Sequence, residues 1–267
     1  MRFTVNNATY AYEIYGEGEV LLLLHGFTGS KQTWQSFVEI WQKSFQVITI
    51  DLPGHGETVT QTVRSMEACC HDIDQLLTYL QIETVHLIGY SMGGRTALSF
   101  ALLYPEKVKT LILESASPGL KQEVDREMRR ANDEKLAKQI ETEGLSAFVQ
   151  FWENIPLFAT QKTLPEQMKK KIYQERIAQT EAGLASSLRH MGTGSQPSWW
   201  ENLSKLIIPV LLIVGELDTK FVTINKMMQK RIAFATLEVV SDAGHAVHIE
   251  QAEIFDRLIR MFITKKQ

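Results

Sequence analysis

The amino-acid sequence predicts an α/β fold: a mostly parallel, twisted sheet with helices on both faces and a helical cap inserted between two strands. Three observations lead to this prediction. Short apolar runs such as "VLLLLHGF" and "VLLIVGELD" alternate with segments of helical periodicity, which is typical of parallel strands buried on both faces. The alternation stops after Pro118 and resumes near Ile208. A Gly-x-Ser-x-Gly turn, residues 89–93, joins a predicted strand to a predicted helix.

The composition is typical of a soluble globular protein and limits the kinds of partner that the chain is expected to bind. The chain has 267 residues, 44% of them hydrophobic and 22% charged, which is enough for a sizeable core. A net charge of −3 argues against nucleic acid or an anionic membrane as the main partner. The start of the chain has the pattern of strands rather than of a targeting segment, and no apolar run is long enough to span a bilayer. Cys69 and Cys70 are neighbours, so we expect two reduced, buried thiols in a cytoplasmic protein.

The N-terminal half alternates strands and helices. Residues 2–6 and 10–16 flank Asn6-Asn7 and predict a hairpin. Further strands are expected over 19–27, 45–56, 84–91 and 108–117, with helices over 32–42, 65–81 and 92–104. Parallel neighbours need such crossover connections, so this order predicts a parallel sheet.

The region after Pro118 contains no convincing strand. It is predicted to form charged amphipathic helices, with breaks near Gly144, Pro156, Pro165 and Gly183. Strands over 208–218 and 236–245 and a last helix over about 249–263 restore the earlier order. We therefore expect a core formed by residues 1–118 and 196–267, with residues 119–195 as a cap or lid.

The turn Gly89-Tyr90-Ser91-Met92-Gly93 matches a nucleophile elbow. In such a turn the serine holds a strained backbone conformation that exposes its hydroxyl. Only glycines two positions away on either side let the strand and helix approach closely enough. Ser91 is therefore the predicted nucleophile.

A serine hydroxyl needs a base, and in this architecture an acid and then a histidine follow the serine along the chain. His245 comes just after a late strand, where a loop can carry its imidazole to the carboxyl edge of the sheet; His248 is its rival. Asp218 ends the preceding strand and is the predicted acid that orients His245. Glu114 is the alternative acid, whereas Asp242 is expected to shape the loop.

Two backbone amides are expected to form an oxyanion hole. The loop "HGFTGS", residues 25–30, follows the first long strand and offers the N–H of Phe27. The residue after the nucleophile offers the N–H of Met92. The segment "DLPGHG", residues 51–56, is expected to shape the backbone.

These residues carry a resemblance to a known family. The segments "LHGF", "DLPGHG", "GYSMGGR", "GELD" and "GH" resemble the α/β-hydrolase superfamily along the whole chain. The segments "ESASPGL", "DREMRRANDEKLA", "FWENIPLF", "MGTGSQPSWW" and "GELDTKF" are similar to the bacterial 2-succinyl-6-hydroxy-2,4-cyclohexadiene-1-carboxylate synthases of menaquinone biosynthesis. The resemblance implies a lyase that uses its Ser-His-Asp set to remove a proton and eliminate pyruvate from an enolpyruvyl cyclohexene carrying three carboxylates.

A substrate of this kind would explain Arg95, which lies one helical turn past Ser91. The planar fork of a guanidinium makes two charge-assisted hydrogen bonds to a carboxylate, which a neutral ester does not require. The resemblance implies that Arg129 and Arg176 of the cap also bind substrate, with Arg130 as the alternative to Arg129, and that Lys220 is a cation near the acid loop. It also implies that Tyr90, Trp152 and Phe158 line the same pocket, although Trp152 could instead be a core aromatic of the cap. The cap is not cationic overall, because residues 121–190 hold 12 Lys and Arg against 11 Asp and Glu.

No metal or organic cofactor is expected, since the cysteines and histidines lack a metal-ligand spacing. The expected partner is a small polycarboxylate, without nucleic acid or membrane insertion, and the chain is expected to be a monomer or small homo-oligomer. The motifs leave two alternatives open. One is a carboxylesterase or thioesterase of the same superfamily, and the other is a non-enzymatic receptor or scaffold on that fold.

Overall fold

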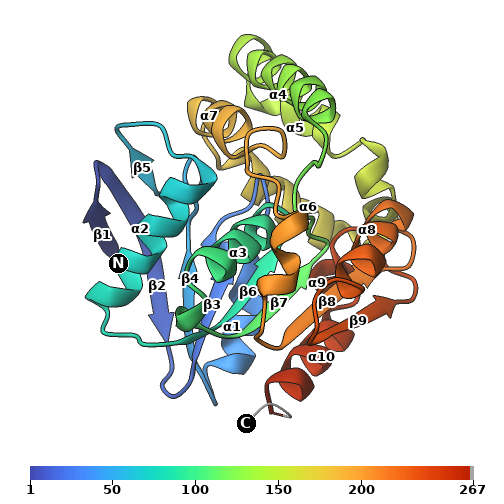
Figure 1. Ribbon diagram of the computed structural model, residues 1–267. Helices are drawn as coiled ribbons and strands as arrows, with labels where there is room; N and C mark the ends of the chain where they lie inside the picture. The colour runs from blue at the N-terminus through green and yellow to red at the C-terminus, as the bar shows by residue number, and fades with distance from the viewer. Residues whose placement is uncertain (265–267) are drawn as a thin grey trace.

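The computed structural model describes residues 1–264 and contains one mostly parallel sheet (Figure 1). The strands are β1 (Arg2–Val5), β2 (Ala8–Tyr15), β3 (Val20–Leu24), β4 (Gln46–Ile50), β5 (Val59–Thr60), β6 (Val85–Tyr90), β7 (Val108–Glu114), β8 (Val210–Gly215) and β9 (Ala235–Val240). Their order is β1-β2-β4-β3-β6-β7-β8-β9, with β5 paired to β2. The pairs that involve β2 are antiparallel, and all neighbours from β4 to β9 are parallel.

The predicted N-terminal hairpin is confirmed. Val5 of β1 faces Ala8 of β2 across the turn. Asn6 and Asn7 hold φ angles of 46° and 61°, the left-handed region that a two-residue hairpin turn requires and that asparagine tolerates.

Two helical layers cover the sheet. The core helices are α1 (Gln35–Trp41), α2 (Met66–Tyr79), α3 (Met92–Leu103), α8 (Thr219–Gln229), α9 (Val247–Glu250) and α10 (Ala252–Thr264), with short turns η1 (Lys31–Trp34), η2 (Pro105–Lys107) and η4 (Trp200–Lys205). Leu22 and Leu24 of β3 pack with residues of α2, α3 and α8, whereas the alternating Leu21 and Leu23 pack with α1 and α10. The near-continuous apolar strand is therefore explained by burial on both faces.

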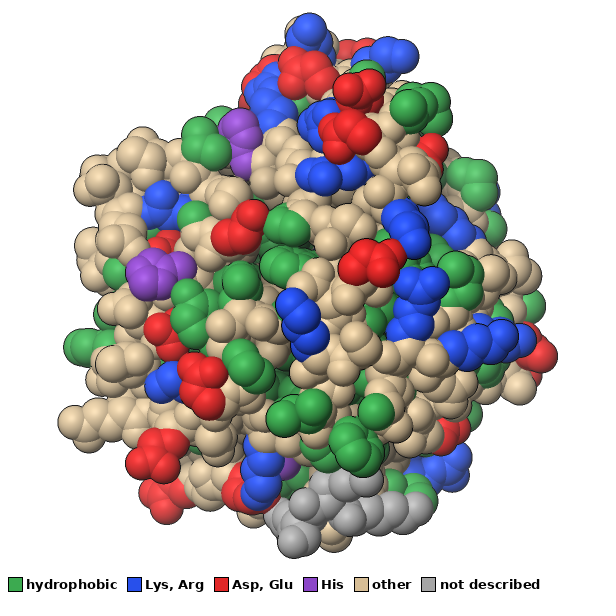
Figure 2. Space-filling model, in the orientation of Figure 1, with side chains coloured by type: hydrophobic (Ala, Val, Ile, Leu, Met, Phe, Trp, Pro, Cys, Tyr) green, Lys and Arg blue, Asp and Glu red, His purple; other side chains and the backbone are tan. Residues whose placement is uncertain are grey.

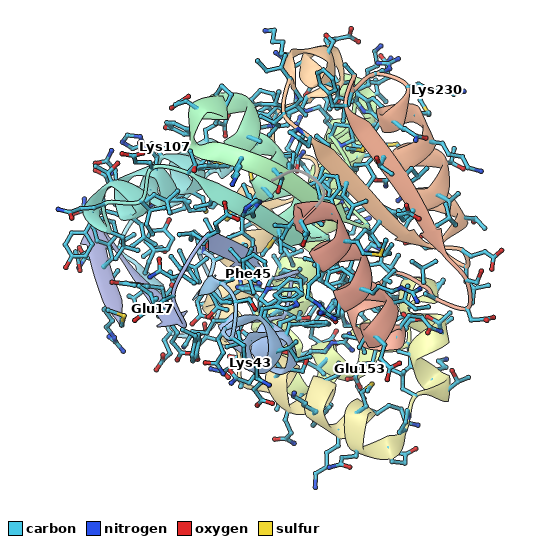
Figure 3. All side chains as sticks on the ribbon, turned by 90° about the horizontal axis from the view of Figure 1, so that it is seen from below. Glu17, Lys43, Phe45, Lys107, Glu153 and Lys230 are labelled. Carbon is cyan, nitrogen blue, oxygen red and sulfur yellow. The ribbon has the colours of Figure 1, made fainter. Side chains whose placement is uncertain are left out.

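Viewed from below, side chains fill the space between the sheet and its helices (Figure 3). Phe45 is buried, while Lys43 beside it and Lys230 are exposed at the rim. Cys69 and Cys70 are free thiols buried in α2, as predicted. No helix within residues 1–264 is both long and apolar enough to cross a membrane.

The segment between β7 and β8 forms the helices that lie above the carboxyl edge of the sheet (Figure 1). They are α4 (Glu123–Glu143), α5 (Leu145–Trp152), η3 (Pro156–Thr163), α6 (Glu166–Ile177) and α7 (Glu181–Met191). Ile140, Phe148 and Leu184 belong to an apolar cluster shared by α4, α5 and α7. Acidic and basic side chains are interspersed over this part of the surface (Figure 2). The limits of the cap, residues 119–195, remain a prediction from the sequence.

Four details differ from the predicted elements. Helix α8 directly after Asp218 was not predicted, nor was the two-residue strand β5. The last predicted helix is divided into α9 and α10, because Gln251 between them has an extended φ of −138°. The predicted strand over 45–56 ends at Ile50, where the loop containing Pro53 and Gly54 begins.

Candidate active site

Ser91 stands at the sharp turn between β6 and α3. Its φ of 51° and ψ of −106° are strained for a residue with a side chain. A Cβ added to Gly89 would lie 2.3 Å from the carbonyl oxygen of Gly93, and one added to Gly93 would lie 2.1 Å from that of Leu24. Glycine is therefore required at both positions, as the steric argument predicts.

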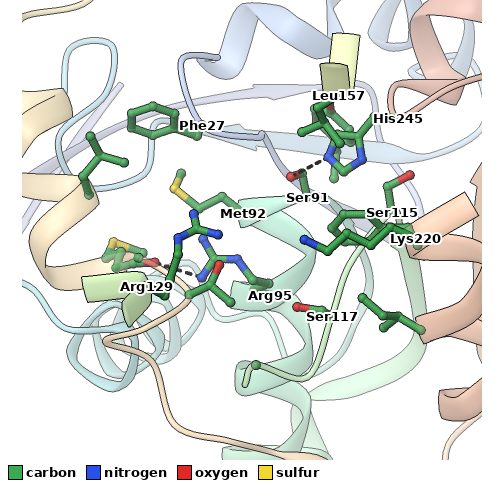
Figure 4. Close-up of a pocket in the computed structure, with 18 of the residues that line it drawn as sticks. Phe27, Ser91, Met92, Arg95, Ser115, Ser117, Arg129, Leu157, Lys220 and His245 are labelled. Atoms are coloured by element: carbon green, nitrogen blue, oxygen red, sulfur yellow. Dashed lines mark hydrogen bonds between the residues drawn. The ribbon is translucent and has the colours of Figure 1, made fainter. Parts of the chain in front are cut away.

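The structure brings the three predicted triad residues into one hydrogen-bonded row. Figure 4 shows the bond between Ser91 and His245. The Ser91 Oγ lies 3.0 Å from His245 Nε2, and His245 Nδ1 lies 2.6 Å from the Asp218 Oδ2. With Nδ1–H donating to the carboxylate, Nε2 is left to accept the serine proton. The three side chains come from the loops after β6, β8 and β9, at the carboxyl edge of the sheet. The arrangement can thus activate the hydroxyl of Ser91.

The rival acid and the rival histidine pair with each other. His248 Nδ1 lies 2.9 Å from both carboxylate oxygens of Glu114, and the two residues are buried. The backbone N–H of His248 also donates to Glu114, at 3.0 Å. The backbone oxygen of Glu114 accepts the N–H of Ser91, at 2.9 Å, so this second pair lies beside the elbow without bonding the Ser91 hydroxyl.

The two predicted oxyanion donors are free. Within residues 1–264, neither the Phe27 nor the Met92 amide donates a hydrogen bond. Met92 is the first residue of α3, where an N–H has no partner in its own helix and the helix dipole favours negative charge. An oxyanion beside Ser91 would therefore find two unoccupied donors of the right kind.

A cleft with a cavity volume of about 190 Å³ opens above Ser91, between the sheet edge and the cap. Most of the predicted site residues line it: Phe27, Tyr90, Ser91, Met92, Arg95, Arg129, Trp152, Phe158, Lys220 and His245. Asp218 lies behind His245 and Arg176 lies elsewhere, so neither is part of the lining. The cleft is the place where a substrate can meet the triad.

Three cations face this cleft (Figure 4). Arg95 and Arg129 lie side by side, and the Lys220 ammonium approaches from the opposite wall. Arg95 donates to the backbone oxygen of Met191, at 2.9 Å, and to the side-chain oxygen of Gln196. Both of these acceptors are neutral. Burial and then the charge of Arg129 lower the pKa of Arg95, the direction expected for a cation that lacks a full counter-charge.

Arg129 has one acidic partner, which is itself buried. Its Nε donates to the Asp133 Oδ1 at 2.8 Å. Burial raises the pKa of Asp133, although Arg129 and Arg95 act in the opposite direction. One carboxylate thus faces two guanidinium groups, so this end of the cleft is suited to a ligand carboxylate.

The structure separates the neighbours Arg129 and Arg130. Arg130 donates to the backbone oxygen of Gly194 at 3.0 Å and to Glu123 at 2.7 Å, and it does not line the cleft. Helical geometry explains this, because consecutive residues on α4 point in directions about 100° apart. The register chosen from the family resemblance is therefore the one that reaches the cleft.

Arg176 is not brought to the triad. Its guanidinium is buried, donates to Glu153 and Gln161 at 3.2 Å each, and lies 4.8 Å from the centre of the Phe158 ring. It lines a second, smaller cavity, and Phe158 lines both cavities. Phe158 thus forms part of the wall between Arg176 and the catalytic cleft.

The aromatic residues predicted for the pocket line the cleft and also pack together. Trp152 stacks on Phe148 at 5.5 Å and meets the edge of Phe27 at 5.4 Å. Trp152 lines the cleft and also packs against the apolar cluster of the cap. Tyr90 is buried with its ring 5.5 Å from that of His245.

Sequence reasoning missed several lining residues. Ser115 has a φ of 48°, and its buried Oγ has no hydrogen-bond partner within residues 1–264. Ser115 and Ser117 lie at the end of a predicted strand, in the segment "ESASPGL", which is the only signal that could have found them. Leu157 and Met191 come from cap positions that no local pattern marks. No group of three or more His, Cys, Asp or Glu in the described part of the chain is placed to hold a metal ion.

Known proteins resemble this chain in both sequence and fold. A family model described as alpha/beta hydrolase fold matches residues 19–252. A Bacillus subtilis protein with the provisional name 2-succinyl-6-hydroxy-2,4-cyclohexadiene-1-carboxylate synthase is 44% identical over 95% of this chain and 94% of its own length. The structure of MenH from S. aureus has a TM-score of 0.93 at 36% identity, over 96% of this chain and 98% of that one. A thermophilic esterase from Thermogutta terrifontis, solved with malate bound, has a TM-score of 0.86 at 28% identity, over 100% of this chain and 99% of that one.

Proposed function

The chain belongs to the α/β-hydrolase family, and from this premise we propose that it is a lyase of menaquinone biosynthesis. In this proposal it eliminates pyruvate from 2-succinyl-5-enolpyruvyl-6-hydroxy-3-cyclohexene-1-carboxylate and forms 2-succinyl-6-hydroxy-2,4-cyclohexadiene-1-carboxylate. The similarity to the Bacillus subtilis protein and to MenH from S. aureus supports this choice over other activities of the family.

The observation that carries the proposal is the pairing of a triad with cations in one cleft. Ser91 and His245 share the cleft with Arg95, Arg129 and Lys220. A neutral ester requires no fixed positive charge, whereas a polycarboxylate needs several to replace its hydration. Arg95 and Arg129 supply a two-guanidinium end, and Lys220 supplies a separate cation on the other wall.

We assign the proton abstraction to Ser91. His245, oriented by Asp218, accepts the serine proton, and Ser91 takes the proton from the carbon next to the succinyl carbonyl. The N–H groups of Phe27 and Met92 hold the enolate oxygen that develops. The electron pair shifts through the ring, the bond from ring carbon to enolpyruvyl oxygen breaks, and pyruvate leaves as its enolate, which then takes a proton. The steps use side chains and amides alone, so the proposed enzyme needs no cofactor and forms no acyl-enzyme.

The remaining assignments follow the same logic. Tyr90, Trp152 and Phe158 provide apolar walls that exclude water from the reacting carbon. The resemblance also assigns Arg176 to the substrate; Phe158 must then turn aside, because its ring lies against that guanidinium. Two free, buried thiols at Cys69 and Cys70 support a cytoplasmic enzyme with a small-molecule partner.

A carboxylesterase is the second candidate, and two observations favour it. The triad and free oxyanion amides are what ester hydrolysis requires, and the Thermogutta terrifontis esterase shares the fold over the full chain. This candidate leaves the three cations of the cleft without a role.

The test is pyruvate release from the enolpyruvyl substrate, generated in place by the preceding enzyme. Because that substrate loses pyruvate slowly by itself, the rate is compared with and without the protein, with p-nitrophenyl esters in parallel. Acceleration that is lost in Ser91→Ala, with poor ester turnover, supports the lyase. Brisk ester hydrolysis without acceleration of pyruvate release would assign the chain to the esterases.

A further inference from the structure

The loop that carries the Phe27 amide is held from the cap. The turn Gly26–Gly29 is closed by a hydrogen bond of 3.1 Å from the Gly29 N–H to the Gly26 oxygen. Thr28, the third residue of this turn, has a φ of 68°. A β-branched residue in the left-handed region is strained, so the turn keeps this shape only if its surroundings fix it.

The core supplies one of the fixing contacts. The Thr28 N–H donates to His55 Nε2 at 3.2 Å. The core also holds the neighbouring backbone: His25 Nδ1 lies 2.7 Å from the Gly26 oxygen, and Asp51 accepts the Lys31 N–H at 2.6 Å. Further contacts come from the cap, at the end of α6 and just after it, more than 140 residues further along the chain.

Glu175 binds the far side of the turn. Its Oε1 accepts the Ser30 N–H at 2.9 Å, the Ser30 hydroxyl at 2.9 Å and the Thr33 hydroxyl at 2.6 Å. An ionised carboxylate is a strong acceptor for such donors. One oxygen of the cap thus fixes the backbone immediately after the strained turn.

Gln179 binds the turn itself and the neighbouring loop. Its Nε2 donates to the Gly29 oxygen at 3.1 Å, and its Oε1 accepts the Gly56 N–H at 2.8 Å. The same Nε2 donates to the backbone oxygen of Glu175 at 3.1 Å, and the side chain is buried. The Gln179 side chain is therefore tied both to the loop and to the backbone of Glu175.

We propose that Glu175 and Gln179 are positioning residues for the oxyanion hole: docking of α6 holds the Phe27 amide where the developing oxyanion needs it. The cap then has two tasks, since it supplies substrate cations and also completes the catalytic machinery of the core. The proposal rests on the oxyanion role assigned to Phe27 above. It applies to any reaction that uses that donor, because no carboxylate of the substrate enters the argument.

The experiment measures the rate at which a fluorophosphonate phosphonylates the Ser91 oxygen with loss of fluoride, a step that needs the activated serine and the oxyanion hole but no polycarboxylate. We expect Glu175→Ala and Gln179→Ala each to lower this rate by about tenfold, because displacing an oxyanion donor is costly. Glu175→Gln keeps an acceptor oxygen and should lose about threefold or less. Amide hydrogen exchange over residues 26–34 should rise in the two alanine variants.

Two variants serve as controls. Gln174→Ala alters the exposed neighbour of Glu175 on the same helix. Arg189→Ala removes the ion pairs of α7 with Glu134 and Glu141 on α4, and so loosens the cap without touching the loop. Both should label at the wild-type rate.

Equal loss in Arg189→Ala, or an unchanged rate in folded Glu175→Ala and Gln179→Ala, would overturn the proposal. Should Glu175→Ala not fold, Gln179→Ala decides by the same criterion. In the pyruvate assay, kcat should fall while KM changes little. If the wild-type protein does not accelerate pyruvate release, the lyase assignment fails, yet the labelling series still tests the positioning role.

Discussion

Ser91 is held in a conformation that points its hydroxyl at a single imidazole, and the chemistry we propose passes through that oxygen. Ser91→Ala removes the oxygen and leaves the cations of the cleft in place. We expect kcat for pyruvate release to fall by about a thousandfold or more, because residues of a triad act as a unit. Product affinity measured by calorimetry should stay within about twofold of wild type, since the carboxylate ligands remain. Near-normal turnover would assign the base to another group.

Arg95 tests the role of charge. Arg95→Ala should lower kcat/KM for pyruvate release by about a hundredfold, since a buried, charge-assisted contact to a carboxylate is lost. Binding and rate should fall together, and Arg95→Lys should recover part of the loss as a point charge without the fork. Arg130→Ala is the control, because Arg130 bonds Glu123 and Gly194 outside the cleft. Unchanged binding and rate in Arg95→Ala would refute the charge-pairing argument.

At the residue scale the sequence predicts the triad because its members lie at strand ends, which parallel topology brings to one edge. It favours His245 over His248 only by position, because His248 falls three residues later, at the expected entrance to the last helix. The structure separates them through their partners, Asp218 for one and Glu114 for the other. The position of Arg176 beside Phe158 has no local signature, because its partners Glu153 and Gln161 lie 23 and 15 residues away in the sequence.

At the scale of the elements, the turn between β6 and α3 allows stability and activity to be tested with one substitution. Gly93→Ala places a Cβ against the backbone oxygens of Leu24 and His25, and backbone cannot move aside as a side chain can. We expect the free energy of unfolding to fall by about 2–4 kcal/mol and activity to be lost as Ser91 shifts. Urea unfolding and fluorophosphonate labelling measure the two effects.

The control for this variant lies on the same helix. Leu103 ends α3 and is 40% exposed, so Leu103→Ala should cost less than about 1 kcal/mol and leave labelling unchanged. A Gly93→Ala protein with wild-type stability and labelling would show that strand and helix can separate at the elbow.

The elements that were predicted correctly are those with strong periodicity. The buried strands β3, β6 and β8 are apolar throughout, and their patterns are unambiguous. Helix α8 was missed because four residues of its sequence, TKFVTINKMMQ, are β-branched and so lower its helix propensity. Its start is set by a side-chain contact, in which Asp218 accepts the N–H of Phe221 at 3.3 Å. Asp218, the triad acid, is therefore also the N-cap of α8, and only the folded structure shows that it has both contacts.

At the scale of the whole molecule, the cap and the core meet through very close backbone contacts. A Cβ added to Gly54 would lie 2.3 Å from the backbone oxygen of Gly183 on α7. The sequence shows that helices interrupt the strand order, but hydrophobic periodicity says nothing of which cap face meets which loop. The contacts of Glu175 with Ser30 and of Gln179 with Gly56 could not be predicted for this reason, since each joins residues more than 120 positions apart.

Two buried histidines beneath the oxyanion loop couple stability to pH. Burial lowers the pKa of His25 to about 4 and, with the nearby charge of His25, that of His55 to about 3. Each ring uses Nε2 as an acceptor, from the Leu52 N–H for His25 and from the Thr28 N–H for His55. Protonation of either nitrogen would remove that acceptor, so the folded state keeps both rings neutral.

The direction of the pH effect follows from the unfolded state, in which a histidine has a pKa of about 6.5. Above that pH both states are neutral and stability does not depend on these groups. Below it the unfolded chain takes up protons that the folded chain refuses, so the free energy of unfolding falls as the pH falls. Each histidine contributes a slope of about 1.4 kcal/mol per pH unit between roughly pH 6 and pH 4.

Chemical denaturation from pH 7 to pH 5 measures this slope, above the range in which most carboxylates titrate. His55→Gln keeps an acceptor for the Thr28 N–H without a titrating group, and should reduce the fall in the free energy of unfolding between pH 7 and pH 5 by about 2 kcal/mol. His86 and His190, whose pKa values burial also lowers, are common to both proteins and cancel in the comparison. His71→Gln, at an exposed position, should leave the slope unchanged. Equal slopes in wild type and His55→Gln would mean that the folded protein accepts a proton at His55, and that the oxyanion loop is held without its neutral imidazole.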